Sequence, residues 1–203
     1  MSKTQKIILV VLLVVIAVVA VVLVLANGKK DNKKEEKASS LKVSSAEELV
    51  NVVEDLYKGK EDDLPGLNTD IIDVKDKDMV NSYTGLKDGS NLEYLVVSEP
   101  FMSSQAYSLV IAKVKEGKDE NSIAKEMSES VDTRKWICVS AEKLYATSSG
   151  DLVFLVMASE DWAKPVYDEF KKLAGNVGKE YEKTEELPDF DDFEQSPTPV
   201  DAQ

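Results

Sequence analysis

The chain of 203 residues contains no histidine and only one cysteine, Cys138. Histidine is the commonest general base and the commonest transition-metal ligand in proteins, so its absence removes the most frequent designs for acid–base catalysis and for a metal centre. A single cysteine excludes a disulfide within the chain. Because Cys138 lies in the apolar stretch 136–139, we expect a buried, inert thiol and not a nucleophile.

The sequence also lacks the short motifs that bind nucleotides or metals. It contains no G-x-G-x-x-G, no G-x-x-x-x-G-K-[ST] and no C-x-x-C. Asp70, Asp73, Asp76 and Asp78 do not follow the ligand spacing of a calcium loop, so we expect a solvated loop there. We therefore predict no catalytic residue, no cofactor-binding residue, no metal site and no cofactor.

Positive charge is scarce, because 25 basic residues face 38 acidic ones and the net charge is −13. Lys3 and Lys6 are the only charged side chains before Gly28, so the rest of the chain carries −15. An acidic body of this kind repels nucleic acid and anionic lipid headgroups. We therefore predict no nucleic-acid partner.

Residues 7–26 form an unbroken apolar run without charge, glycine or proline. As a helix such a run reaches about 30 Å, the thickness of the hydrocarbon core of a bilayer. We predict that it is an uncleaved transmembrane helix, a signal anchor that binds the lipid bilayer, preceded by a short tail at 1–6. A cleaved signal peptide is the alternative, but its apolar region is usually only about 7–15 residues long.

The orientation of this anchor is open. Five lysines follow the apolar run within 29–37, against Lys3 and Lys6 before it, and this bias favours a cytoplasmic C-terminal side.

Residues 27–43 are polar and rich in lysine and serine, which is typical of a flexible stalk. A single globular domain is predicted at 44–175. An acidic disordered tail is predicted at 176–203.

Capping and periodicity predict the elements of the domain. A capping box at Ser44–Glu47 opens a first helix that ends at Gly59, and a short helix is expected over Asp76–Tyr83. The remaining elements are expected in this order: strands at 92–98 and 106–114, a helix capped by Asp119, strands at 142–148 and 152–158, and a helix capped by Asp161 that ends at Gly175.

This order is strand, strand, helix, twice over, preceded by a helix. We predict a single two-layer α+β domain, in which an antiparallel sheet carries helices on one face in a ββαββα arrangement. The apolar strand at 152–158 is expected to be central. A shift of 43 residues aligns Ile111 with Phe154 and Ile123 with Val166.

Serine and lysine recur at S-x-x-K spacing, which some acyl-transfer enzymes use to place a lysine amine beside a serine hydroxyl. The pairs are Ser39/Lys42, Ser122/Lys125 and Ser140/Lys143. Neither K-T-G nor S-D-N accompanies them, and such pairs arise freely in a chain rich in serine and lysine. In the tail, Phe190 and Phe193 lie within the acidic run 189–194, which is either a short docking motif or a solvated tail.

From about Asp70 to Gly175 the chain resembles domain of unknown function family 4358, described as lipoproteins of Gram-positive bacteria. The matching segments are Asp76–Met79 leading to Tyr83–Leu86, the strands EYLVV and AYSLVIAKV, the acidic helix after Gly117, and GDLVFLVMAS before the last helix. The resemblance implies an extracytoplasmic domain tethered to the membrane. A lipoprotein needs a cysteine just after the apolar run, whereas Ala26, Asn27 and Gly28 stand here.

Together these features predict a membrane-anchored extracytoplasmic domain that acts as a non-enzymatic binding or interaction module at the cell envelope. An envelope protein or wall material is the expected partner. One alternative is a serine–lysine acyl hydrolase that acts on peptides or wall material. Another is a cytoplasm-facing regulatory membrane protein, which the lysines of the stalk favour.

Overall fold

The computed structural model describes residues 41–102 and 104–185. The predicted transmembrane helix at 7–26 lies outside these residues, as do the predicted tail at 1–6 and most of the stalk. In the part of the chain that the structure does describe, no helix combines the length and the apolar character needed to cross a bilayer.

Six strands form one sheet in the order β1-β2-β3-β5-β4-β6, and every neighbouring pair is antiparallel. The α+β class and the antiparallel sheet are therefore confirmed. The strands are β1 (Leu67–Ile72), β2 (Leu92–Pro100), β3 (Ser108–Val114), β4 (Lys143–Ser149), β5 (Leu152–Ala158) and β6 (Tyr181–Thr184).

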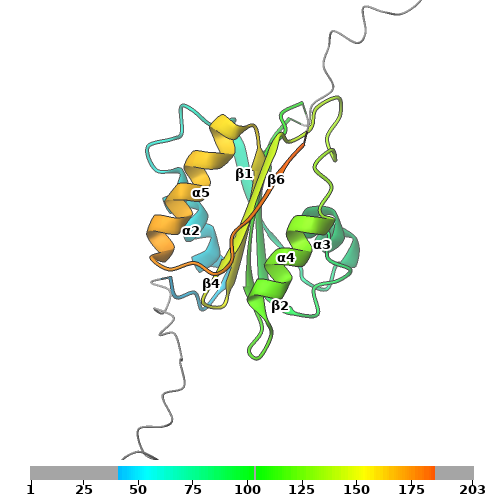
Figure 1. Ribbon diagram of the computed structural model, residues 1–203, viewed down its shortest axis with the longest axis vertical. Helices are drawn as coiled ribbons and strands as arrows, with labels where there is room; N and C mark the ends of the chain where they lie inside the picture. Colours follow the sequence, from blue (N-terminus) through cyan, green and yellow to red (C-terminus); the bar gives the residue numbers. More distant parts are fainter. Residues whose placement is uncertain (1–40, 103, 186–203) are drawn as a thin grey trace, which may run out of the picture. The chain divides into compact units, whose positions relative to one another are not determined.

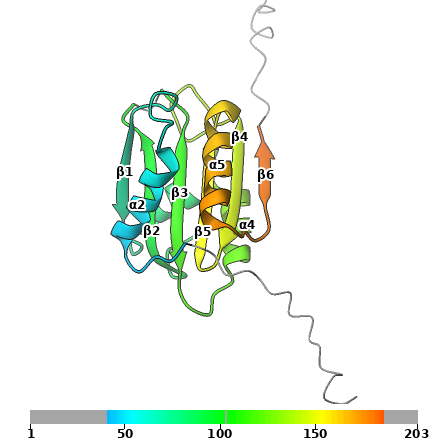
Figure 2. The same ribbon diagram turned by 90° about the vertical axis from the view of Figure 1, so that its left-hand side faces the viewer.

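Helices cover both faces of this sheet, so the prediction of helices on one face is wrong (Figures 1 and 2). One face carries α2 (Ala46–Tyr57) and α5 (Glu160–Ala174). The other face carries α3 (Lys77–Thr84) and α4 (Glu120–Ser130). The domain thus has three layers and two hydrophobic cores.

The handedness of the chain connections explains this arrangement. The antiparallel pairings make β4 parallel to β3, with β5 between them, and β6 parallel to β5, with β4 between them. α4 therefore lies in the crossover from β3 to β4, and α5 lies in the crossover from β5 to β6. Both crossovers move along the sheet toward β6, but they start from strands that run in opposite directions. Because such crossovers are right-handed in nearly all proteins, their helices must lie on opposite faces.

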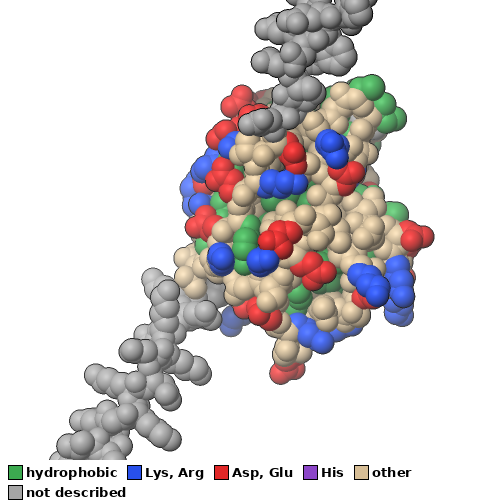
Figure 3. Space-filling view, turned by 45° about the vertical axis from the view of Figure 1, so that its right-hand side comes forward, with side chains coloured by type: hydrophobic (Ala, Val, Ile, Leu, Met, Phe, Trp, Pro, Cys, Tyr) green, Lys and Arg blue, Asp and Glu red, His purple; other side chains and the backbone are tan. Residues whose placement is uncertain are grey.

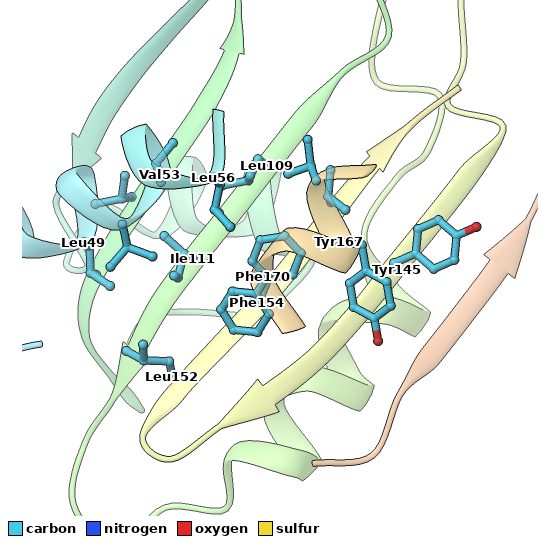
Figure 4. Packing of buried hydrophobic residues seen from close by; sticks show 14 of the residues in the cluster. Leu49, Val53, Leu56, Leu109, Ile111, Tyr145, Leu152, Phe154, Tyr167 and Phe170 are labelled. Carbon is cyan, nitrogen blue, oxygen red and sulfur yellow. The ribbon is translucent and has the colours of Figure 1, made fainter. Parts of the chain in front are cut away.

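The central strand β5 shows how each core is built. All seven residues of β5 are buried, because alternate side chains point to opposite faces and both faces are covered. Phe154 packs under α2 and α5 and stacks on Phe170 with 4.2 Å between ring centroids (Figure 4). Leu155, its neighbour in sequence, belongs to the core under α3 and α4. The prediction that this strand is central is confirmed.

Most helix ends follow the predicted capping chemistry. The Asp119 carboxylate accepts a hydrogen bond from the first turn of α4, as predicted. Asp76, predicted as the first residue of the short helix, is instead the N-cap of α3. Two predicted N-caps are wrong. At α2 the hydroxyl of Ser45 accepts from the Glu48 amide while the Glu48 carboxylate accepts from the Ser44 amide, so the capping box lies one residue later than predicted. α5 begins after Ser159, two residues before the predicted cap.

An internal duplication would explain the alignment of the two units, and the strands obey it whereas the helices do not. Ile111 and Phe154, equivalent under the shift of 43 residues, face each other in the register of β3 and β5. A twofold repeat centred between these two residues would place α4 and α5 on the same face of the sheet. Instead Ile123 of α4 and Val166 of α5 lie in different cores, which favours a chance match of apolar positions.

Two edge strands, β1 and β6, were not predicted. β6 lies at 181–184 and pairs with β4, so the predicted disordered tail is wrong in its first part and the domain extends beyond 175. Residues 186–203 lie outside the described part of the chain. The link from α5 to β6 is fixed by three hydrogen bonds to β4: Ser149 Oγ to Asn176 O (2.5 Å), Gly178 N to Ser148 O (2.8 Å) and Thr147 Oγ1 to Lys179 O (3.1 Å).

Gly178 permits this close approach, so we predict that Gly178→Ala loosens β6. A Cβ at this position would lie 2.3 Å from Asn121 Oδ1 and 2.4 Å from Ser148 Oγ, two atoms that are hydrogen-bonded to each other. Moving them should cost about 1–3 kcal/mol in the free energy of unfolding, measured with urea, and should speed amide exchange in β6. The control is Gly66→Ala, because a Cβ there makes ordinary contact with Phe101 at 3.8 Å. Equal stability of the two variants would contradict the prediction.

Candidate functional site

The structure does not bring the predicted serine–lysine pairs together. Ser122 Oγ donates to the Asp119 carboxylate at 2.6 Å, while Lys125 Nζ is 2.7 Å from Glu129 Oε2. Lys143 Nζ contacts the carboxylates of Glu182 and Glu160 and donates to Thr184 Oγ1. Among the described residues it makes no contact with Ser140. Ser39 lies outside the described residues. The spacing that suggested an acyl hydrolase thus has no structural counterpart at the two pairs the structure describes.

Cys138 also differs from expectation. Cys138 is exposed and has a φ of 61°, so the prediction of a buried thiol is wrong. Trp136 and Trp162 are partly buried and pack against the edges of the two cores. Trp136 and Cys138 belong to the segment 131–142 that connects α4 to β4, which we call the α4–β4 loop.

A cluster around Lys135 ties the α4–β4 loop to the sheet. Lys135 Nζ lies 2.5 Å from Glu99 Oε1 at the end of β2 and donates to Ser108 Oγ at 3.3 Å at the start of β3. The Lys135 side chain is only 13% exposed, and that of Glu99 is 25% exposed. Glu99 Oε1 itself is buried and accepts no hydrogen bond of good geometry from the described residues, so the ion pair is what balances its charge.

Two opposing effects act on the pKa of Lys135, and the net shift is downward. Burial lowers the pKa of Lys135, and the adjacent Glu99 carboxylate opposes that shift. The ammonium also lies 4.8 Å from the centroid of the Tyr83 ring and 5.4 Å from that of Trp136, distances typical of cation–π contacts. Burial, followed by the negative charges of Glu99 and Asp70, raises the pKa of Tyr83.

This arrangement is suited to holding a loop rather than to catalysis. Although it contains a serine–lysine contact, the Ser108 side chain is fully buried and the Lys135 ammonium is paired with a carboxylate. A nucleophile must reach its substrate, and a general base must be able to accept a proton. The cluster meets neither need. It fixes the α4–β4 loop across the end of β2 and β3.

Three large hydrophobic side chains are exposed close to this contact. Phe101 and Met102, just after β2, are 76% and 62% exposed, and Ile137 of the α4–β4 loop is 70% exposed. Both loops lie at the upper end of the sheet in Figures 1 and 2. Figure 3 shows hydrophobic side chains at this end, whereas acidic and basic side chains are scattered over most of the remaining face. We call the surface formed by Phe101, Met102 and Ile137 the apolar end.

The concave surface at the opposite end of the sheet is lined by residues that form ion pairs with one another. It is lined by the turns after β3 and β4. Lys113 Nζ lies 3.2 Å from Glu93 Oε2 and 3.8 Å from Asp151 Oδ2, and Lys115 Nζ donates to the Ser90 carbonyl at 2.7 Å. Among the described residues no group of carboxylates and cysteine is arranged to hold a metal ion.

Comparison with known proteins adds no family to this picture: no family model, no curated protein and no solved structure matches the chain. The resemblance to domain family 4358 therefore stays a prediction.

Sequence reasoning missed both the Lys135 cluster and the apolar end. Glu99 and Lys135 are 36 positions apart, and no local pattern links them. A signal for the apolar end was present, because Phe101 and Met102 stand at the start of a polar loop where large hydrophobic residues gain nothing from the core. Ile137 was obscured by its apolar neighbours, which suggested burial.

We predict that Lys135→Met lowers the free energy of unfolding by about 1–3 kcal/mol, because it leaves the Glu99 carboxylate without its partner. The loss should fall short of that for a fully buried pair, since a quarter of the Glu99 side chain reaches water. Lys125→Met is the matched control: its exposed pair with Glu129 spans one helical turn and should contribute at most about 0.5 kcal/mol. Urea unfolding measures both, and equal losses would contradict a structural role for the Lys135 pair.

Proposed function

We propose that this chain is a membrane-anchored, extracytoplasmic binding module that uses the apolar end to contact a protein partner at the cell envelope. The observation that carries the proposal is the exposure of Phe101, Met102 and Ile137 around a fixed ion pair. Exposed apolar groups that gather on an otherwise charged surface are typical of protein contacts.

The apolar end lies far from the point at which the described chain begins. The described domain begins near the start of β2, where Tyr94 donates to the Ser44 carbonyl at 3.2 Å. Phe101 follows the other end of the same strand. At the rise of a β-strand these seven residues span about 23 Å. Ser44, close to the first described residue, therefore lies at the end of the sheet opposite the apolar end.

The nature of the surface also favours a protein over a lipid or a small molecule. An aromatic ring, a thioether and a branched aliphatic side chain offer adaptable apolar contact. The domain as a whole is acidic, which opposes contact with anionic headgroups. We infer that the partner presents an apolar segment flanked by polar groups.

Site-specific photocrosslinking in intact cells tests this function. A benzophenone amino acid replaces Ile137 in the full chain, and the same residue at Met79, a less exposed position on α3, is the control. We expect a discrete protein adduct from position 137 and none from position 79. Phe101→Asp in the same chain should remove the adduct, because a charge at the centre of an apolar contact costs several kcal/mol.

Two results would contradict the proposed function. One is an adduct to lipid at position 137, which would make the apolar end a membrane contact. The other is an identical adduct pattern at both positions that Phe101→Asp leaves unchanged, because random collision would then account for it.

The exposed thiol of Cys138 gives a direct test of the side of the membrane on which the domain lies. Because Cys138 is the only cysteine in the chain, a membrane-impermeant maleimide reports on one position. An extracytoplasmic domain should be labelled in intact cells to the same final extent as after lysis. Labelling that requires lysis would overturn this placement and support the cytoplasm-facing alternative.

A further inference from the structure

The described chain ends at the same end of the sheet as the apolar end. β6 runs parallel to β5, so both strands finish at the end of the sheet where the α4–β4 loop lies. After β6, the Glu185 amide donates to the Glu142 carbonyl at 2.9 Å, and Thr133 Oγ1 donates to Glu185 Oε1 at 3.0 Å. Residue 185 is therefore fastened to the same loop that carries Ile137.

The segment that follows can reach the apolar end. β2, which leads into Phe101, is four places from β6 in the sheet, a distance of about 19 Å at the usual strand spacing. From Glu185 the chain can extend to about 17 Å at Phe190 and to about 27 Å at Phe193. The α4–β4 loop, which carries Ile137, contacts Glu185 through Thr133 and Glu99 through Lys135, so it lies along this path.

The chemistry of that segment matches what it would meet. Residues 189–194 read Asp-Phe-Asp-Asp-Phe-Glu, and Phe190 and Phe193 are the only aromatic residues after Tyr181. At the apolar end the two rings would find hydrophobic partners. The acidic residues would find Arg134, an exposed cation of the α4–β4 loop. Hydrogen bonds from Lys183 and Thr133 lower the pKa of Glu185, and the charge of Arg134 contributes to the same shift.

We propose that the chain's own segment 189–194 docks on the apolar end through Phe190 and Phe193 and competes there with the partner. This inference rests on the proposed function, since it names the regulation of the same surface. The segment begins four residues after Glu185 on the same chain, so its effective concentration is far above that of a separate partner. A partner must displace it, and without a partner the segment covers the surface most of the time.

The test uses the rate at which Cys138 reacts with a maleimide in the full chain, held in phosphatidylcholine nanodiscs so that no detergent occupies the apolar end. The double variant Phe190→Ser/Phe193→Ser should raise the rate about three- to tenfold, the factor expected if the segment covers the surface about 70–90% of the time. The matched control is Pro197→Ser/Pro199→Ser, two changes further along the same tail, which should leave the rate unchanged.

A second variant keeps the result interpretable. A chain that ends at Glu185 retains β6 and should react as fast as the double serine variant, and a synthetic peptide of residues 186–203 should slow it again. An unchanged rate in both variants would overturn the inference. Protection that grows with protein concentration would overturn it as well, because the segment would then dock on a second copy. Failure here together with a persisting crosslink at position 137 leaves the proposed function standing.

Discussion

The architecture depends on one topological constraint, the shared hand of the two crossovers through α4 and α5. Because β3 and β5 run in opposite directions and both crossovers move toward β6, the helices must lie on opposite faces. The same parallel relations return the chain after α4 to the end where β3 starts, and after β6 to the end where β5 finishes. The loop after β2, the α4–β4 loop and the last described residue thus meet at one end of the sheet.

The Lys135–Glu99 ion pair turns this meeting of loops into a defined surface. It spans the sheet end from the α4–β4 loop to β2, and the aromatic rings beside it limit the water that reaches the ammonium. Both partners are largely buried, so a loop displaced from the sheet would leave a poorly solvated charge behind. The ion pair therefore favours a single position of the loop, with Ile137 exposed at the same end of the sheet as Phe101. We see the exposed hydrophobic residues as a consequence of this fixed position.

Local chemistry made much of the fold predictable. Asp76 and Asp119 lie where capping requires them, and the apolar run 152–158 is the central strand that its composition indicated. That same run contained a clue to the third layer, since a strand buried on one face alternates more strictly between apolar and polar residues. The face of each helix depends on strand direction and order, which the sequence does not carry locally. β6 was missed because its residues, Tyr-Glu-Lys-Thr, are polar and are held by hydrogen bonds of the preceding link to β4. The candidate site was harder to predict, because Glu99 and Lys135 meet only after the sheet has formed.

The central claim is that the ion pair between Lys135 and Glu99 holds the α4–β4 loop against the sheet. A double-mutant cycle with Lys135→Met, Glu99→Gln and the combined variant, followed by urea unfolding, measures their interaction directly. We predict a coupling free energy above about 1 kcal/mol, as found for partners that touch in a shared network. A coupling free energy near zero would show that the two residues act independently and would contradict the account.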